Sequence, residues 1–237
     1  MQLTFQKAQI IKVLKELYII LNRVTGKGTV KLRPDLTRLT ITLQGTDADY
    51  GAVLKKSAGD TETLRAAAEQ LGFARDQMKT LQLHVETLYE GYQDDKGVYR
   101  NRFVGYQFQH TLKLEFPLDD ALLGRTLYAL AHSGVQPEFH ISYTLSDPES
   151  AKNALLAQAV RDAAAKAEVL AAAAGTGLGS LLSIDYSWGE PELAVHPMRK
   201  LAADNRMAES AMGSYELGVE PDDITVSDTV TVLWELT

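Results

Sequence analysis

Apolar residues recur at alternating steps of four and three between residues 146 and 175, which predicts one long helix with a single apolar face. The apolar positions are Leu156, Val160, Ala163, Ala167, Leu170 and Ala174. The segment from Ser146 to Glu149 predicts a capping box with Ser146 at the N-cap, and Gly175 is typical of a helix end. Because most of this face is alanine, a neighbouring element can approach closely, and we expect that element to be a sheet.

Elsewhere the apolar period changes to two, the spacing of strands that have one polar face. Residues 24–32 and 38–44 lie on either side of the turn signal Arg33-Pro34-Asp35, and this arrangement predicts a hairpin. Further strands are predicted at 139–145, 182–188 and 224–236, and shorter helices at 47–72 and 118–133.

A second, longer hairpin is predicted from residues 81–89 and 104–116. The even-numbered residues from Val104 to Phe116 are apolar apart from His110, which is typical of a half-buried strand. Because both strands are longer than a small core requires, we expect their distal ends to project and to meet another subunit. The candidate interface residues are Tyr89, Tyr92, Tyr99 and Phe103. Burial of such rings against a helix is the alternative, and we prefer it for Tyr106 and Phe108.

From residue 36 to residue 145 the order strand, helix, strand, strand, helix, strand predicts a split β-α-β pattern, as in ferredoxin-like folds. The long Ala-rich helix and two further strands add to this pattern. We therefore expect an α+β fold with one antiparallel or mixed sheet and with helices packed on one face. The expected organisation is an N-terminal extension or helix at 1–22 and a single domain at 23–237, with a mobile insertion at 189–221.

Composition narrows the class of function. The 237 residues carry a net charge of −7, which argues against broad nucleic-acid binding because phosphate contacts need a basic surface. The chain has no cysteine, so disulfides, thiolate catalysis and Cys-ligated metals are excluded. Residues 6–21 are interpreted as a packing helix or an extension, and their apolar run is too short for a membrane span. A peripheral membrane adaptor that uses this helix is the minority alternative.

No stretch carries a recognisable catalytic chemistry. The five histidines do not have the spacing of metal ligands, and we expect no metal, no cofactor and no catalytic residue. Strand pairing can still bring His84, His110 and His140 together, so a small-molecule or metal-binding enzyme with a site near them is the alternative. The loop Gly175-Thr-Gly-Leu-Gly closes a helix and opens a strand, the reverse of a phosphate-binding loop, and is interpreted as a cap.

Several segments follow one another in a fixed order through most of the chain after Val24. They are Val24-Thr-Gly-Lys-Gly-Thr-Val, Arg33-Pro-Asp, Tyr143-Thr-Leu-Ser-Asp-Pro-Glu, Lys166-Ala-Glu, Leu170-Ala and Leu178-Gly. In this order they resemble the SIMPL domain family, also called YggE-like proteins or domain of unknown function 541. The residues before Val24 and the segment 189–221 are not covered by the resemblance.

The resemblance implies an α+β fold, assembly into large homo-oligomeric rings or channel-like structures, and export to the periplasm or cell surface in many members. The biochemical activity of the family is undefined, and its links to oxidative-stress tolerance do not map onto residues. Because no convincing signal sequence is found, cytoplasmic residence is the plainer expectation, with export as the alternative. The leading hypothesis is a non-enzymatic SIMPL-like protein with a stress-related or scaffolding role, whose partner is a copy of itself, with no nucleic acid and no membrane contact.

Overall fold

The computed structural model describes residues 20–186, 193–195 and 220–237, and the chain divides into two compact units. Unit 1 comprises Met1–Leu32, Asp147–Leu193 and Asp223–Thr237, and unit 2 comprises Arg33–Ser146 and Ala194–Asp222. Each unit is built on an antiparallel sheet that packs against helix, which confirms the α+β class. One sheet was expected, and the described residues form two.

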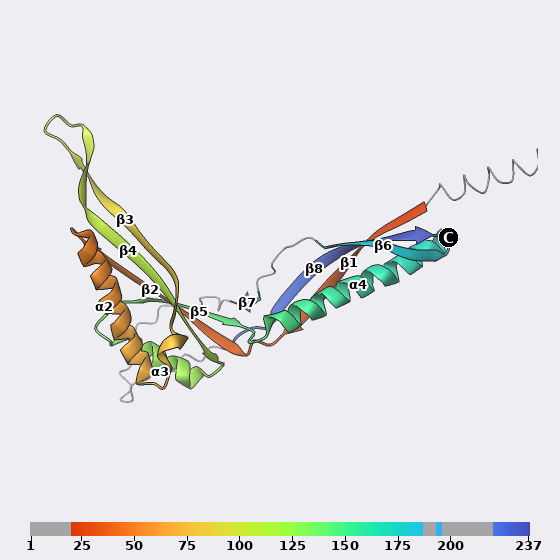
Figure 1. Ribbon diagram of the computed structural model, residues 1–237, viewed down its shortest axis with the longest axis horizontal. Helices are drawn as coiled ribbons and strands as arrows, with labels where there is room; N and C mark the ends of the chain where they lie inside the picture. Colours follow the sequence, from red (N-terminus) through yellow and green to blue (C-terminus); the bar gives the residue numbers. More distant parts are fainter. Residues whose placement is uncertain (1–19, 187–192, 196–219) are drawn as a thin grey trace, which may run out of the picture. The chain divides into compact units, whose positions relative to one another are not determined.

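Unit 1 is a three-stranded sheet crossed on one face by a long helix (Figure 1). Its strands are β1 (Ile20–Leu32), β8 (Ile224–Leu236) and β6 (Leu178–Tyr186), in the order β1-β8-β6, and the helix is α4 (Pro148–Ala173). The core between them joins small residues of the helix to large residues of the sheet. It contains Val24, Val230, Val232 and Trp234 from the strands and Ala159, Ala163 and Ala167 from α4.

The predicted helix is present, but its buried face and its cap differ from the prediction. The buried residues are Ala151, Leu155, Ala159, Ala163, Ala167 and Ala171, a row with a constant spacing of four. Of the predicted face, Ala163 and Ala167 are in this row, and Leu156 and Val160 are partly buried beside it. The last two, Leu170 and Ala174, are exposed. A row spaced by four winds slowly around the helix, so it stays in contact with a twisted sheet.

The N-cap is Asp147, whose carboxylate accepts from the backbone N–H of Ser150 at 3.0 Å. Ser146, the predicted cap, instead donates its hydroxyl to Asp35 Oδ2 at 2.6 Å, and its backbone N–H goes to the same carboxylate. These two hydrogen bonds lower the pKa of Asp35, the side-chain bond contributing most. The capping signal was therefore real but lies one residue further along the chain.

Glycines of β1 allow α4 to lie against the sheet. A Cβ placed on Gly26 would lie 2.0 Å from the carbonyl oxygen of Ala159, and one on Gly28 would lie 2.2 Å from that of Leu155. The segment Val24-Thr-Gly-Lys-Gly is therefore a site of close backbone approach, which explains why two glycines interrupt a strand.

Side chains of α4 also cover the outer edge of β1. The backbone N–H of Lys27 donates to Asp162 Oδ2 at 2.7 Å, and that of Thr29 donates to Gln158 Oε1 at 3.0 Å. One turn further on, Lys166 Nζ donates to the carbonyl oxygen of Thr25 at 3.4 Å. Backbone groups at the open edge of β1 are therefore hydrogen-bonded to side chains of α4. In a bare edge strand these groups would be available to pair with another strand.

The first predicted hairpin is wrong in its pairing. β1 pairs along its whole length with β8, from Ile20 opposite Leu236 to Leu32 opposite Ile224. The next strand, β2 (Leu36–Asp47), belongs to the sheet of unit 2, where it pairs with β4 and β5. Alternation shows which face of a strand is buried but does not identify the neighbouring strand, and the turn at 33–35 connects two units.

Unit 2 contains the predicted split β-α-β pattern. Its strands are β2, β3 (Lys79–Gln93), β4 (Tyr99–Pro117), β5 (Glu138–Thr144) and β7 (Ala194–Val195), in the order β3-β4-β2-β5-β7. Helix α2 (Tyr50–Glu69) follows β2, and helix α3 (Asp120–Ala131) connects β4 to β5. The first strand of the pattern therefore lies between the third and the fourth, as the ferredoxin-like topology requires.

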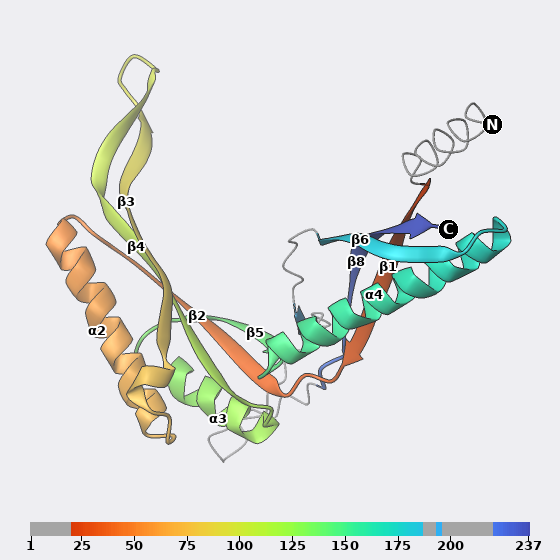
Figure 2. The ribbon, with the colours of Figure 1, turned by 45° about the vertical axis from the view of Figure 1, so that its right-hand side comes forward.

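The two described helices of unit 2 and a short 3-10 turn (Arg75–Gln77) lie beside this sheet (Figure 2). The core combines alternate residues of β2 and β4 with one stripe of each helix, so the helices cover one face, as predicted. Its fully buried members include Leu39, Ile41, Leu43, Val53, Leu64, Phe108, Leu112, Leu114, Leu123 and Leu130.

Two predictions fall largely outside the described residues. The helix predicted at 6–21 is described only at Ile20 and Leu21, which begin strand β1. Of the insertion predicted at 189–221, the structure describes residues 193–195 and 220–221.

Candidate functional site

The long hairpin extends past the end of its neighbouring strand. β3 and β4 pair from Lys79 opposite Lys113 to Gln93 opposite Tyr99, which confirms the predicted pairing. β2 accompanies β4 only as far as Asp47, opposite Tyr106. Residues 88–105, here called the arm, are therefore a two-stranded ribbon with no third strand among the described residues, and Figures 1 and 2 show them reaching beyond α2.

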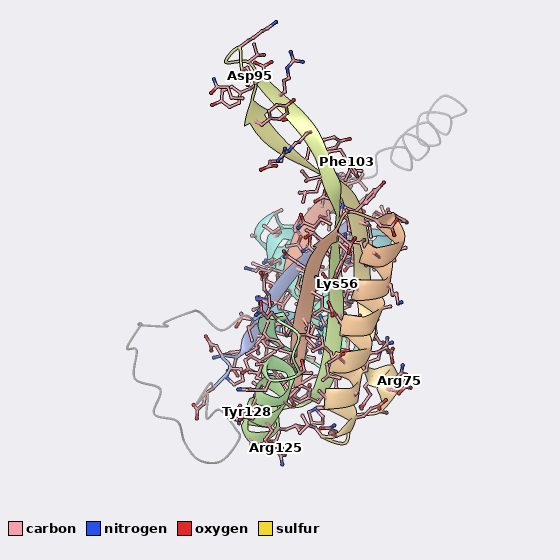
Figure 3. All side chains as sticks on the ribbon, turned by 90° about the vertical axis from the view of Figure 1, so that its left-hand side faces the viewer. Lys56, Arg75, Asp95, Phe103, Arg125 and Tyr128 are labelled. Atoms are coloured by element: carbon pink, nitrogen blue, oxygen red, sulfur yellow. The ribbon has the colours of Figure 1, made fainter. Side chains whose placement is uncertain are left out.

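Aromatic side chains follow one face of the arm. The ring centroids of Tyr89 and Phe103 lie 6.0 Å apart in an edge-to-face contact. The same contact joins Phe103 to Tyr106 and Tyr106 to Tyr50 of α2, with the centroids 5.3 Å apart in each pair. Tyr89 is 58% exposed and Phe103 is 49% exposed, so the row is open to solvent. Figure 3 shows Phe103 near the base of the arm, where the ribbon leaves the sheet, and Asp95 at its tip.

The other two candidate interface residues lie nearer the tip. Tyr99 is 81% exposed, and Tyr92 lies under the guanidinium of Arg102, 5.9 Å from the ring centroid. Arg102 also pairs with Glu90 at 2.6 Å, on the same face as Tyr92. Phe108 is fully buried and Tyr106 is half-buried, in agreement with the preference stated for these two rings.

A bulge at Gly105 decides which residues form the aromatic face. The register shifts between Leu88 and Tyr89, so Val104 has no partner on β3. Gly105 has φ +147°, and a Cβ there would lie 2.4 Å from the carbonyl oxygen of Asp47. Beyond the bulge the odd-numbered residues take the apolar side, so Phe103 and not the predicted Val104 lies beside Tyr106. In the sequence, the available signal for this bulge was a glycine within a clear alternation of apolar and polar residues.

Asp94 organises the turn at the tip of the arm. Its carboxylate accepts from the backbone N–H groups of Lys96 and Val98 at 3.0 Å each and from Arg100 Nε at 2.6 Å. The Arg100 hydrogen bond is the main cause of a lowered pKa at Asp94. Asp94 is thus a turn residue.

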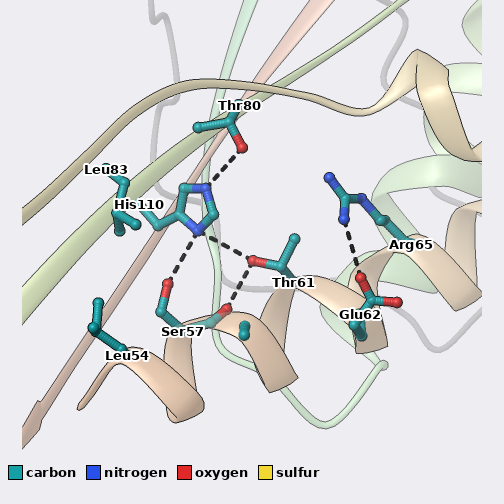
Figure 4. A pocket seen from close by; sticks show the side chains of 9 residues that line it. Leu54, Ser57, Thr61, Glu62, Arg65, Thr80, Leu83 and His110 are labelled. Atoms are coloured by element: carbon teal, nitrogen blue, oxygen red, sulfur yellow. Dashed lines mark hydrogen bonds and ion pairs between the residues drawn. The ribbon is translucent and has the colours of Figure 1, made fainter. Parts of the chain in front are cut away.

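A cavity of about 230 Å³ lies between α2 and strands β3 and β4 (Figure 4). Its wall is formed partly by apolar side chains and partly by polar side chains. The lining comprises Leu54, Ser57, Ala58, Thr61, Glu62 and Arg65 from α2, Thr80 and Leu83 from β3, and His110 from β4.

His110 is buried in the wall of this cavity and is held by three hydroxyl groups. Its Nδ1 lies 3.1 Å from both Ser57 Oγ and Thr61 Oγ1, and its Nε2 lies 2.9 Å from Thr80 Oγ1. The Thr61 hydroxyl donates to the carbonyl oxygen of Ser57, so towards His110 it acts as an acceptor. Burial, followed by the charge of Arg65, lowers the pKa of His110, which favours the neutral imidazole.

A cluster of charged residues borders the same cavity. Glu62 receives hydrogen bonds from Arg75 and from Arg65, the latter through Nη1 at 3.0 Å, and these bonds lower its pKa, with Arg75 contributing most. Arg65 Nε is shielded from solvent and has no protein hydrogen-bond partner in the part of the chain that the structure describes. Two guanidinium groups thus share the carboxylate of Glu62, and Arg75 also pairs with Glu69 at 3.6 Å.

The structure does not bring His84, His110 and His140 together. His110 is on the helix-covered face of β4, opposite Leu83, whereas His84 is on the other face of β3 and 3.5 Å from Glu86. His140 is on β5, which β4 and β2 separate from β3 by about 14 Å. The described residues contain no group of three or more potential ligands that could hold a metal ion.

The residues that do surround His110 were missed by the sequence analysis. Ser57 and Thr61 occupy the buried row of α2 together with Val53, Leu64 and Ala68. Two hydroxyl residues in an otherwise apolar row, four residues apart, were the signal that a polar partner faces this helix.

Among residues 20–186, 193–195 and 220–237 no helix is long and apolar enough to cross a membrane. No curated protein matches this chain. A family model described as SIMPL, protein of unknown function (DUF541), matches residues 23–234, nearly the whole sequence. The glycine pair of β1, the N-cap before α4 and the row of small residues on α4 all lie within the matched residues of the chain. The chain therefore belongs to the SIMPL family.

Proposed function

We propose that this chain is a non-enzymatic protein that assembles with copies of itself through the arm. The observation that carries the proposal is the open row of aromatic rings on a two-stranded ribbon, Tyr89 and Phe103 being about half exposed and Tyr99 more so. Isolated two-stranded ribbons are only marginally stable in water. A partner that covered these rings would bury large aromatic surfaces and would stabilise the ribbon.

Charge supports a second copy as that partner. The arm carries three acidic residues, Glu90, Asp94 and Asp95, and three basic residues, Lys96, Arg100 and Arg102, so its net charge is zero in a chain of −7. Two arms can therefore approach without the repulsion that the whole chains would otherwise experience. Within one arm Arg102 pairs with Glu90 and Arg100 with Asp94, so two arms related by a twofold axis would meet through balanced ion pairs and not through unpaired like charges.

The chemistry around His110 supports the non-enzymatic part of the proposal. Ser57 Oγ is within hydrogen-bond distance of His110 Nδ1, as in a nucleophile–base pair. The other ring nitrogen, however, faces the hydroxyl of Thr80 and not a carboxylate that would stabilise an imidazolium. Ser57 is also almost completely buried within α2.

Sedimentation velocity tests the proposal with two matched double variants. Tyr99→Lys with Phe103→Lys removes two exposed apolar residues of the arm, and Val169→Lys with Leu170→Lys removes two similarly exposed residues of α4. Both variants add two positive charges. We expect a concentration-dependent assembly in the wild-type chain and in the α4 variant, and a monomer in the arm variant. A wild-type chain that remains monomeric at micromolar concentration, or equal assembly of both variants, would refute the proposal.

A further inference from the structure

We infer that the cavity beside His110 is a binding site for a small monocarboxylate with a short apolar tail. This inference does not depend on self-assembly, because the cavity lies against the body of unit 2 and not in the arm. It rests on the division of the cavity wall into a cationic end and an apolar side.

Arg65 provides the cationic end. Its guanidinium lies across the cavity from His110 in Figure 4, with Thr61 and Thr80 between them. Only Nη1 is engaged by Glu62, and Nε is a buried donor without a protein partner among the described residues. A planar guanidinium with unused N–H groups matches a carboxylate, which can accept two hydrogen bonds at once.

The charged groups that line the cavity favour a monoanion over a cation or a dianion. Arg65 and Arg75 both pair with Glu62, and Arg75 also pairs with Glu69 at 3.6 Å, so the four charges of this cluster balance. His110 adds none, because burial favours its neutral form. A cation would be repelled by Arg65, and a doubly charged phosphate would face the nearby Glu62 with only one charge compensated.

Leu54, Ala58 and Leu83 form the apolar side, where a tail of the ligand would lie. Leu83 is 47% exposed, so a tail that covered it would also remove apolar surface from water. The volume of about 230 Å³ is that of roughly seven or eight water molecules at about 30 Å³ each, which suits an acid with a short hydrocarbon chain.

Hexanoate is a suitable probe, with binding to the full chain followed by amide chemical shifts in NMR spectra. We expect saturable shifts at Ala58, Thr61 and Leu83, with a Kd on the order of 1 mM for a ligand of this size. Acetate should bind more weakly because it lacks the tail, and hexylamine should not bind because it carries the wrong charge. Absence of saturable shifts, or equal affinity for acetate and hexanoate, would overturn the assignment.

Three variants separate the two ends of the site. Arg65→Gln should weaken hexanoate binding by at least about tenfold, because it removes the charged bidentate donor. Arg75→Gln also removes a partner of Glu62, but Arg75 does not line the cavity, so this control should bind within about twofold of the wild type. Ala58→Phe fills the cavity from an exposed helix position and should abolish binding with Arg65 intact. Equal affinity in Arg65→Gln and Arg75→Gln, or full binding in Ala58→Phe, would refute the site.

Discussion

His110 shows how a single buried side chain makes the stability of unit 2 depend on pH. Its pKa in the folded chain lies below the ordinary value of 6.5, chiefly because of burial. The unfolded chain therefore takes up a proton first when the pH falls. The charged groups that face it are Arg65 and Glu62, and the arginine opposes protonation further.

We predict that the contribution of His110 to the free energy of unfolding is largest above pH 6.5, and that it decreases as the pH falls below 6.5. Urea denaturation between pH 5 and pH 7.5 would measure the effect. His110→Gln keeps polar atoms near the three hydroxyls but does not titrate, so its stability should change less over the same range. An equal pH dependence in the variant would assign the effect to other groups.

Position 26 requires glycine because there is no space for a larger side chain, and not because the backbone there must be flexible. We predict that Gly26→Ala destabilises the chain by about 3 kcal/mol or more, because its Cβ would collide with backbone atoms of α4 that cannot move independently. The matched control is Gly59→Ala in α2, where no atom lies within 4 Å of the added Cβ. There the same change should stabilise by about 0.5–1 kcal/mol. Chemical denaturation of both variants would reveal the opposite signs, and a neutral Gly26→Ala would contradict the packing described.

At the scale of elements, the side chains of α4 that cover β1 replace a neighbouring strand. We predict that Asp162→Ala speeds hydrogen exchange of the Lys27 amide several-fold, because this amide loses its acceptor. Lys166, whose hydrogen bond is the main cause of the lowered pKa of Asp162, would lose its partner as well. Glu168→Ala is the control, since Glu168 is an exposed residue on the same helix and is not among the acceptors of the β1 edge. Unchanged exchange at Lys27 would show that the edge is not protected in this way.

At the scale of the whole molecule, the sequence located elements more reliably than it located their partners. The strand predicted at 224–236 coincides with β8, and the helix predicted at 118–133 contains α3, because alternation and capping are local properties. The partner of β1, in contrast, is about 200 residues away and is marked by no local pattern. The cavity could not be predicted either, because Ser57, Thr80 and His110 meet only once the sheet order is known.

Unit 2 should fold without unit 1. All residues of its core cluster lie within residues 33–146, and so do the strands and helices of the split β-α-β pattern. We predict that a fragment of these residues gives a dispersed NMR spectrum and a cooperative urea transition. Leu114→Ala, which removes a fully buried side chain of β4, should destabilise the fragment by about 2–5 kcal/mol. A collapsed fragment without cooperative unfolding would show that the core of unit 2 is not self-sufficient.

The pairing of β1 with β8 has a consequence for biosynthesis. A nascent chain emerges from the ribosome N-terminus first, so β1 appears early but cannot find its partner until residues 224–236 have been translated. During this interval β1 has no companion strand, while residues 33–146 can already acquire their structure. The sheet of unit 1 is thus completed only after residues 224–236 have been translated, well after β1 has left the ribosome.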